Sequence, residues 1–187
     1  MSVFEFLLAL YAIIAGIGVS LLVRSVGQMI EARDRVQLYW VHTTWLALIF
    51  VVHVVTWFAL WRFHDHSPWT VWQALLLLAM PILLYLVSHL AVPELEDEAV
   101  HDMREYYFRQ CGWIQGLMLG VIVSGTAAQI GIEGSPDASG PGVLRVAAAL
   151  ALLPGVFTRR PMIHATQAVL LLTIVALGIS FLSKPIG

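Results

Sequence analysis

The stretch that decides the fold is Tyr39–Trp61, YWVHTTWLALIFVVHVVTWFALW, which contains no Asp, Glu, Lys or Arg. A helix of about 20 residues crosses the ~30 Å hydrocarbon core of a bilayer, so this stretch is long enough to span a membrane. Five other apolar stretches lie at Val3–Val23, Thr70–Val92, Cys111–Ile132, Val143–Thr158 and His164–Ser183. The sequence therefore predicts an all-α membrane protein with six transmembrane helices, forming a single domain over residues 1–187.

The composition supports the same conclusion. Hydrophobic residues make up 59% of the 187 residues and charged residues only 12%. A soluble domain of this size could not bury so much apolar surface, so the expected surroundings are a lipid bilayer. No segment between the stretches is long enough to fold separately. The net charge of −2 gives no reason to expect a nucleic-acid partner.

The distribution of basic residues predicts the orientation. Seven lie in alternate connections, at Arg24, Arg33, Arg35, Arg104, Arg109, Arg159 and Arg160, whereas the opposite side has Arg62, Arg145 and Lys184. Because basic residues favour the cytoplasmic side, we expect both termini to be periplasmic. A re-entrant 143–158 segment, which is short and contains Pro154, would instead place the C-terminus inside.

The N-terminal stretch and the composition predict the compartment. The first stretch lacks a basic start and contains Glu5, so we expect a retained span rather than a signal peptide. One lysine against nine arginines, with no asparagine, indicates a GC-rich bacterial genome. We therefore expect a multi-pass protein of the bacterial inner membrane.

Small residues recur every four positions in two of the stretches. They lie at Gly112, Gly116, Gly120, Ser124 and Ala128, and at Ala12, Gly16 and Ser20. Small residues at this spacing let membrane helices approach closely, which predicts packing of the first span against the fourth. The alternative is a subunit interface, and we also expect a homo-oligomer. Gly16 in the first stretch corresponds to Gly120 in the fourth, and Gln73 in the third corresponds to Gln167 in the sixth. This correspondence between the two halves of the chain suggests a 3+3 inverted repeat, and the alternative is chance similarity.

Ionisable residues inside the apolar stretches are the candidates for function. His53 lies near the middle of Tyr39–Trp61, and His42 lies about three helical turns before it on the same face. Polar side chains at similar depth are Tyr11, Tyr85, Ser124 and Thr173, and nearer the ends are Glu5, His89 and His164. Such residues are costly in a membrane and mark ion or solute pathways, and histidine titrates near neutral pH. The alternative is a neutral histidine that hydrogen-bonds a neighbouring helix.

These residues favour a channel or secondary transporter for an ion or small solute, either with or without coupling to protons. One alternative is a redox subunit that binds quinone or haem b, with His42 and either His89 or His164 as axial ligands. Another is a non-catalytic assembly or sensor subunit, whose acidic helix Glu94–Arg109 would dock a cytoplasmic partner. Glu98-x-x-His101 has di-iron spacing but is better interpreted as a solvated helix face. Without a Walker loop, HExxH or Ser-His-Asp set, we predict no metal site and no catalytic residues.

One segment also carries a resemblance. Arg35–His42, RVQLYWVH, followed by Trp45, Trp57 and Trp61, resembles uncharacterised small multi-pass bacterial inner-membrane proteins. The resemblance centres on the first two spans. It implies about six helices and no activity, so it transfers no functional residue.

Overall fold

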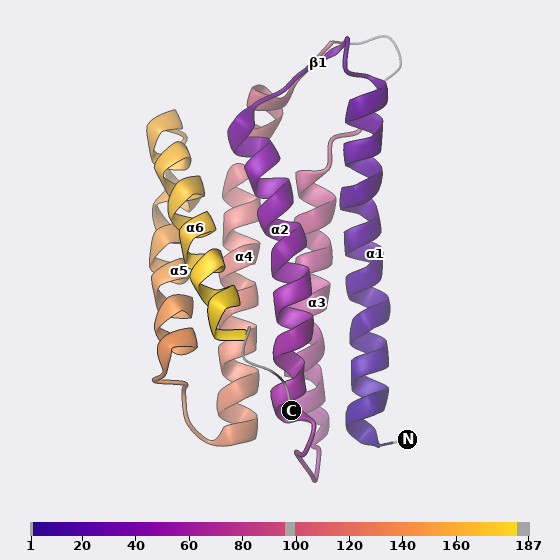
Figure 1. The fold of residues 1–187 in the computed structure, drawn as a ribbon, viewed down its shortest axis with the longest axis vertical. Coiled ribbons are helices and arrows are strands. Elements are labelled where there is room, and N and C mark those ends of the chain that lie inside the picture. The colour runs from indigo at the N-terminus through magenta and orange to yellow at the C-terminus, as the bar shows by residue number, and fades with distance from the viewer. Residues whose placement is uncertain (1, 96–99, 183–187) are drawn as a thin grey trace.

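The computed structural model is a bundle of six long helices (Figure 1), and it describes residues 2–95 and 100–182. The helices are α1 (Val3–Glu31), α2 (Trp40–Ala59), α3 (Val71–Ala91), α4 (Met103–Glu133), α5 (Gly140–Phe157) and α6 (Pro161–Leu182). A 3-10 helix, η1 (Leu60–Phe63), continues α2, and two short strands, β1 (Val36–Gln37) and β2 (His101–Asp102), pair in parallel. Six helices are long and apolar enough to cross a membrane, which confirms the predicted fold class.

Local side chains explain where three helices begin. Ser2 and Glu5 form a capping box at the start of α1, and Thr70 and Gln73 form another at the start of α3. The carboxylate of Asp102 caps α4 by accepting from two backbone N–H groups of its first turn. Each cap satisfies N–H groups that have no partner inside the helix.

The helix that we expected over Glu94–Arg109 begins later than predicted. Residues 93–95 and 100 are not helical, His101–Asp102 pairs with β1, and α4 starts only at Met103. The pairing with β1 and the Asp102 cap fix this start. The acids at 96–98, including the Glu98 of the Glu-x-x-His spacing, lie outside the described residues.

The helices run alternately up and down (Figure 1), so that the connections gather at two ends. We call the end with the α1–α2, α3–α4 and α5–α6 connections the cleft end. The end with the α2–α3 and α4–α5 connections, where α1 begins, is the ion-pair end. Helix α5 runs as one helix from the ion-pair end toward the cleft end, and α6 returns. The segment 143–158 thus crosses the bundle rather than turning back within it.

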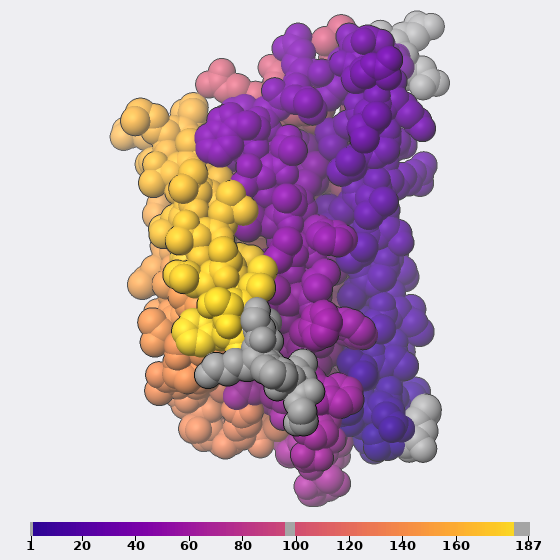
Figure 2. Space-filling model, viewed as in Figure 1, coloured from indigo at the N-terminus to yellow at the C-terminus, as the bar shows by residue number. Residues whose placement is uncertain are grey.

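Helix α3 lies between α1 and α4, and it packs extensively against both. Among the described residues, α1 and α4 share almost no contact, so the predicted pairing of the first and fourth spans is replaced by pairing through α3. Helix α5 packs between α4 and α6, and α6 packs against α2. The space-filling view shows side chains of α6, α2 and α1 filling the middle of one face (Figure 2). The inverted repeat and the homo-oligomer remain predictions.

The stripe of small residues on α4 divides between two neighbours. A step of four residues turns a helix by about 400°, so the stripe winds about 40° per step. Gly112 accordingly faces the Val156 carbonyl of α5, whereas Gly120 faces Leu83 of α3. A Cβ at Gly116 would have no neighbour within 4 Å among the described residues. The outward-facing stripe on α1 includes Gly16, which is equally open, and Ser20, which is exposed.

Candidate functional site

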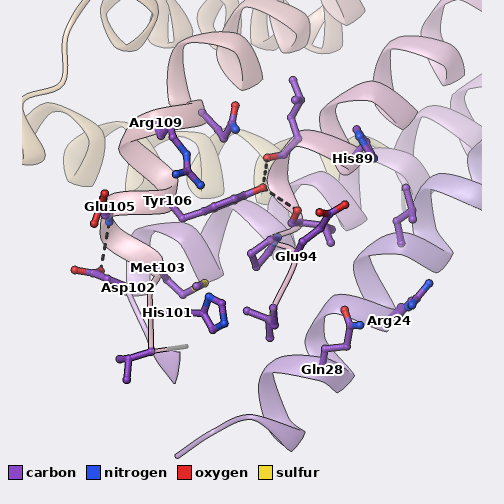
Figure 3. A pocket seen from close by; sticks show the side chains of 17 residues that line it. Arg24, Gln28, His89, Glu94, His101, Asp102, Met103, Glu105, Tyr106 and Arg109 are labelled. Atoms are coloured by element: carbon purple, nitrogen blue, oxygen red, sulfur yellow. Dashed lines mark hydrogen bonds between the residues drawn. The ribbon is translucent and has the colours of Figure 1, made fainter. Parts of the chain in front are cut away.

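A polar cleft of about 840 Å³ opens at the cleft end, between α1, the end of α3 and the start of α4 (Figure 3). Its charged and titratable lining residues are Arg24, His89, Glu94, His101, Asp102, Glu105 and Arg109. The volume lies within the range of about 300–1,000 Å³ that is typical of ligand pockets. The cleft is therefore large enough to hold a small solute.

Tyr106 forms the floor of this cleft. Its hydroxyl donates to the backbone carbonyls of Leu90 at 3.0 Å and Val92 at 2.7 Å, at the end of α3. Carbonyls at a helix end have no partner within the helix, so this side chain fastens the start of α4 to the end of α3. The Arg109 guanidinium lies over the Tyr106 ring, 5.4 Å from its centroid.

The charges that face the cleft are not paired with one another. Within residues 2–95 and 100–182, the ion pairs closer than 4.0 Å involve none of Arg24, Glu94, Glu105 and Arg109. Figure 3 shows Arg109 and Glu105 on one side of Tyr106, and Glu94 and Arg24 on the other. Among the described residues, the cleft thus presents Arg24, Arg109, Glu94 and Glu105 without an ion pair between them.

Below the cleft, three buried positions lie in a row along one face of α1, and two of them carry hydroxyl groups. Tyr11, Gly18 and Ser25 are spaced by seven residues, which is nearly two turns, or about 10 Å along the helix. All three are buried against the neighbouring helices. Within the described part of the chain, the hydroxyls of Tyr11 and Ser25 have no hydrogen-bond partner, although Thr56 lies close to Tyr11. We call this row, together with His53 and Ser88, the polar seam.

His53 lies at the centre of the polar seam, with only 2% of its surface exposed. Its Nδ1 lies 2.9 Å from the Ile49 carbonyl. Because a carbonyl only accepts, we assign the ring proton to Nδ1, which leaves Nε2 as an acceptor without a partner. A Cβ placed on Gly18 would lie 2.6 Å from this Nε2 and 3.4 Å from the Ser88 hydroxyl. Helices α1, α2 and α3 therefore meet around one buried imidazole.

His42 lies beneath the floor of the cleft and has the same character. Its Nε2 lies 2.9 Å from the Ala91 carbonyl, and its Nδ1 has no partner. Its ring packs edge-on against Tyr106 at 5.8 Å. The predicted shared face of His42 and His53 is thus buried, and both rings present an unpartnered acceptor.

A separate buried network surrounds His164. Its Nε2 lies 2.8 Å from the Thr158 carbonyl, which assigns the ring proton to Nε2. Its Nδ1 therefore accepts from the Tyr107 hydroxyl at 2.8 Å and from the Gln115 amide at 3.1 Å. Both nitrogens of His164 are engaged, so it fits a packing role better than a pathway role.

Two glutamines extend this network to α5. The Gln167 amide donates to Gln115 Oε1 at 2.7 Å and to the Ala151 carbonyl at 2.7 Å. A Cβ on Gly155 would lie only 1.8 Å from Gln115 Oε1, so the backbone of α5 approaches this amide closely. The network therefore holds α4, α5 and α6 together.

A cluster of charges ties together the helix ends at the ion-pair end. Arg62, which follows α2, makes two hydrogen bonds to Glu133 at the end of α4, at 2.8 and 2.9 Å. Asp137 bridges Arg62, at 3.6 Å, and Arg145 of α5, at 3.1 Å. We call these four residues the ion-pair cluster, which links α2, α4 and α5.

The Asp137 carboxylate is held in its charged form. It accepts hydrogen bonds from the backbone N–H of Ser139, at 2.9 Å, and from the Ser139 hydroxyl. These bonds lower the pKa of Asp137, and the nearby Arg145 and Arg62 lower it further, against an opposing effect of burial. Asp137 is therefore charged at neutral pH.

The structure does not bring all the predicted pathway residues together. Tyr11 and His53 lie in the polar seam, and His42 lies between the seam and the cleft. Tyr85 lies outside the seam: it is half-buried, and its ring stacks on the ring of exposed His89. Thr173 is exposed on α6 and bonds its own helix, as does buried Ser124 on α4. Glu5 belongs to the capping box of α1.

Several residues of these sites were not among the predicted ones. Gln115 and Gln167 are amides inside apolar stretches, which was a usable signal because such groups need partners in a membrane. Arg24 and Arg109 were used only to predict orientation. The partnership of Arg62 with Glu133 joins residues 71 positions apart, and nothing in the sequence indicated it.

Metal and haem binding have few candidate ligands. Within the described residues, no three His, Cys, Asp or Glu side chains are grouped as a metal site. Axial ligation by His164 through Nδ1 would require the release of Tyr107 and Gln115, whereas His42 could ligate through Nδ1 and keep its bond to the Ala91 carbonyl. The haem alternative remains a prediction.

Comparison with known proteins adds no assignment. No family model, curated protein or solved structure matches the chain. The resemblance carried by Arg35–His42 therefore remains a prediction, and function has to be argued from the geometry.

Proposed function

We propose that the protein is a small secondary transporter of the bacterial inner membrane that moves a polar solute or ion, linked to protons. The observation that carries the proposal is the asymmetry of the two ends. The cleft end opens as a polar cavity, whereas the ion-pair end is closed by the Arg62–Glu133–Asp137–Arg145 cluster. A transporter exposes its site to one side at a time, and this arrangement has the form expected of one such state.

The predicted orientation agrees with this proposal. The seven basic residues lie toward the cleft end, in its connections or in the adjoining turns of α1 and α4, which would make this end cytoplasmic. The cleft would then be an inward-facing site. The ion-pair cluster would close the periplasmic side, where breaking a few partly exposed ion pairs would suffice to open it.

His53 is the candidate for proton coupling. It is buried midway between the two ends, and its Nε2 is an acceptor without a partner. Protonation would convert this acceptor into a donor directed at the backbone of Gly18 and at the Ser88 hydroxyl. Because Gly18, His53 and Ser88 belong to α1, α2 and α3, a proton there would change the packing of all three helices.

Proteoliposomes loaded with a pH-sensitive dye would test the proposal. Candidate solutes are added under an imposed pH gradient, and we expect solute-dependent proton entry. His53→Gln should reduce it at least tenfold, whereas Thr173→Val, on the exposed face of α6, should retain it. Vesicles that respond no more than empty ones across amino-acid-like, anionic and cationic solutes would refute transport. Equal rates for His53→Gln and the wild type would refute the role of His53.

A further inference from the structure

The chemistry of the cleft indicates which class of solute it takes. Tyr106 lies between a cation and an anion, because Arg109 covers its ring and Glu94 lies on its other side (Figure 3). Arg24 adds a second cation from α1, and Glu105 adds a second anion from α4. A simple anion would meet Glu94 and Glu105, and a simple cation would meet Arg24 and Arg109.

The absence of internal pairing strengthens this argument. Glu105 and Arg109 are four residues apart on α4, the spacing at which helical ion pairs form. Arg109 nevertheless lies over the Tyr106 ring, and no ion pair with Glu105 is present among the described residues. Tyr106 is itself fixed by two hydrogen bonds to the end of α3. The cation is therefore held in place before any ligand arrives, which reduces the entropic cost of binding.

We propose that the cleft binds a small zwitterion, with its anionic group at Arg109 and its cationic group at Glu94. This inference names the solute class of the proposed transporter and, as a statement about transport, rests on that proposal. A guanidinium binds a carboxylate or phosphate through two parallel hydrogen bonds, and a carboxylate accepts from an ammonium group. The zwitterion could be a free amino-acid-like solute or the ethanolamine headgroup of a phospholipid, since both share this chemistry.

Binding to the purified full-length protein tests the inference without transport. Titration calorimetry compares glycine, β-alanine and 4-aminobutyrate, whose charges lie progressively further apart, with acetate and ethylammonium. We expect at least one of the three zwitterions to bind at least tenfold more tightly than either singly charged probe. A lipid arm repeats the titration in phosphatidylethanolamine and phosphatidylglycerol nanodiscs, with glycerophosphoethanolamine as an added probe. Loss of free-zwitterion binding only in phosphatidylethanolamine would assign the site to the headgroup.

Matched variants locate the binding. Arg109→Gln and Glu94→Gln should each weaken it at least tenfold. Arg33→Gln and Glu31→Gln remove exposed charges at the same end but outside the cleft, and should change it less than twofold. Equal binding of acetate or ethylammonium, equal effects of the control variants, or no binding of any zwitterion would overturn the inference. Flux without zwitterion binding would overturn only this inference, whereas zwitterion binding without flux would refute only transport.

Discussion

The two ends of the bundle use the same kinds of charged side chain with opposite results. At the ion-pair end, Arg62 and Arg145 find Glu133 and Asp137, and the connections are tied together. At the cleft end, Arg109 and Glu94 lie on either side of Tyr106 and remain without charged partners among the described residues. The number of charges therefore does not decide whether an end is open. What decides it is whether the connections bring opposite charges within reach of each other.

Cysteine labelling should give the largest difference between the two ends. The only native cysteine, Cys111, is buried and provides a low background. Gln28→Cys would lie in the cleft, whereas Gln129→Cys would lie buried beside Glu133 under the ion-pair cluster. In detergent, where both ends meet the reagent, we expect nearly complete labelling of the first by a polar maleimide and almost none of the second. Comparable rates for the two would remove the distinction between an open and a closed end.

Midway between the two ends, the close packing of α1 against His53 of α2 can be disrupted at Gly18. A Cβ there would lie 2.6 Å from His53 Nε2, so Gly18→Ala must displace the imidazole or separate α1 from α2. Overpacking of this kind costs about 1–3 kcal/mol. Gly16→Ala is the matched control, because its Cβ has no described neighbour within 4 Å and alanine favours a helix by about 0.5–1 kcal/mol. We expect thermal unfolding in detergent to show a loss for Gly18→Ala alone, and equal stability of both variants would contradict the tight crossing.

The sequence predicted the helices well because their signal is local. Tyr39–Trp61 contains no Asp, Glu, Lys or Arg, and it forms α2 and the first half of η1 with boundaries close to those expected. The shared face of His42 and His53 also followed from helical spacing, and the structure shows that both are buried. By contrast, the start of α4 depends on pairing of β1 with β2, and the placement of α3 between α1 and α4 depends on how six similar helices pack. Both are long-range choices that an apolar pattern does not encode.

The candidate site was predictable only in part, for the same reason. His53 stood out because an ionisable group in a span is costly wherever it lies. Arg109 and Arg24 lie near span ends, where arginine is common, and only the folded chain shows that they face one cavity. Thr173 had a suitable depth along its helix but faces outward, because depth alone does not give direction.

Removing Arg62 should open the ion-pair end at a small cost in stability. Arg62→Gln leaves Glu133 and Asp137 with fewer partners, but the Arg62 and Glu133 side chains are 39% and 30% exposed, so solvent screens the pair. The expected loss is therefore about 0.5–1 kcal/mol. In the Gln129→Cys background, the same change should raise the labelling rate several-fold, whereas Arg33→Gln should not. An unchanged rate would show that packing, rather than the ion-pair cluster, closes this end.

The smallest expected effect is a pH dependence centred on Asp137. Its pKa is lowered by the bonds from Ser139 and by Arg145 and Arg62, so the folded protein binds this proton less readily than the unfolded chain. The stabilisation is therefore present above the ordinary aspartate pKa of about 3.9 and is lost as the pH falls through the lower, folded value. Unfolding temperatures between pH 7 and pH 3 should show the wild type above Asp137→Asn at neutral pH, with the difference disappearing in acid. A difference that stayed constant would mean that Asp137 acts through shape alone, and the ion-pair end would then owe its closure to the connections rather than to their charges.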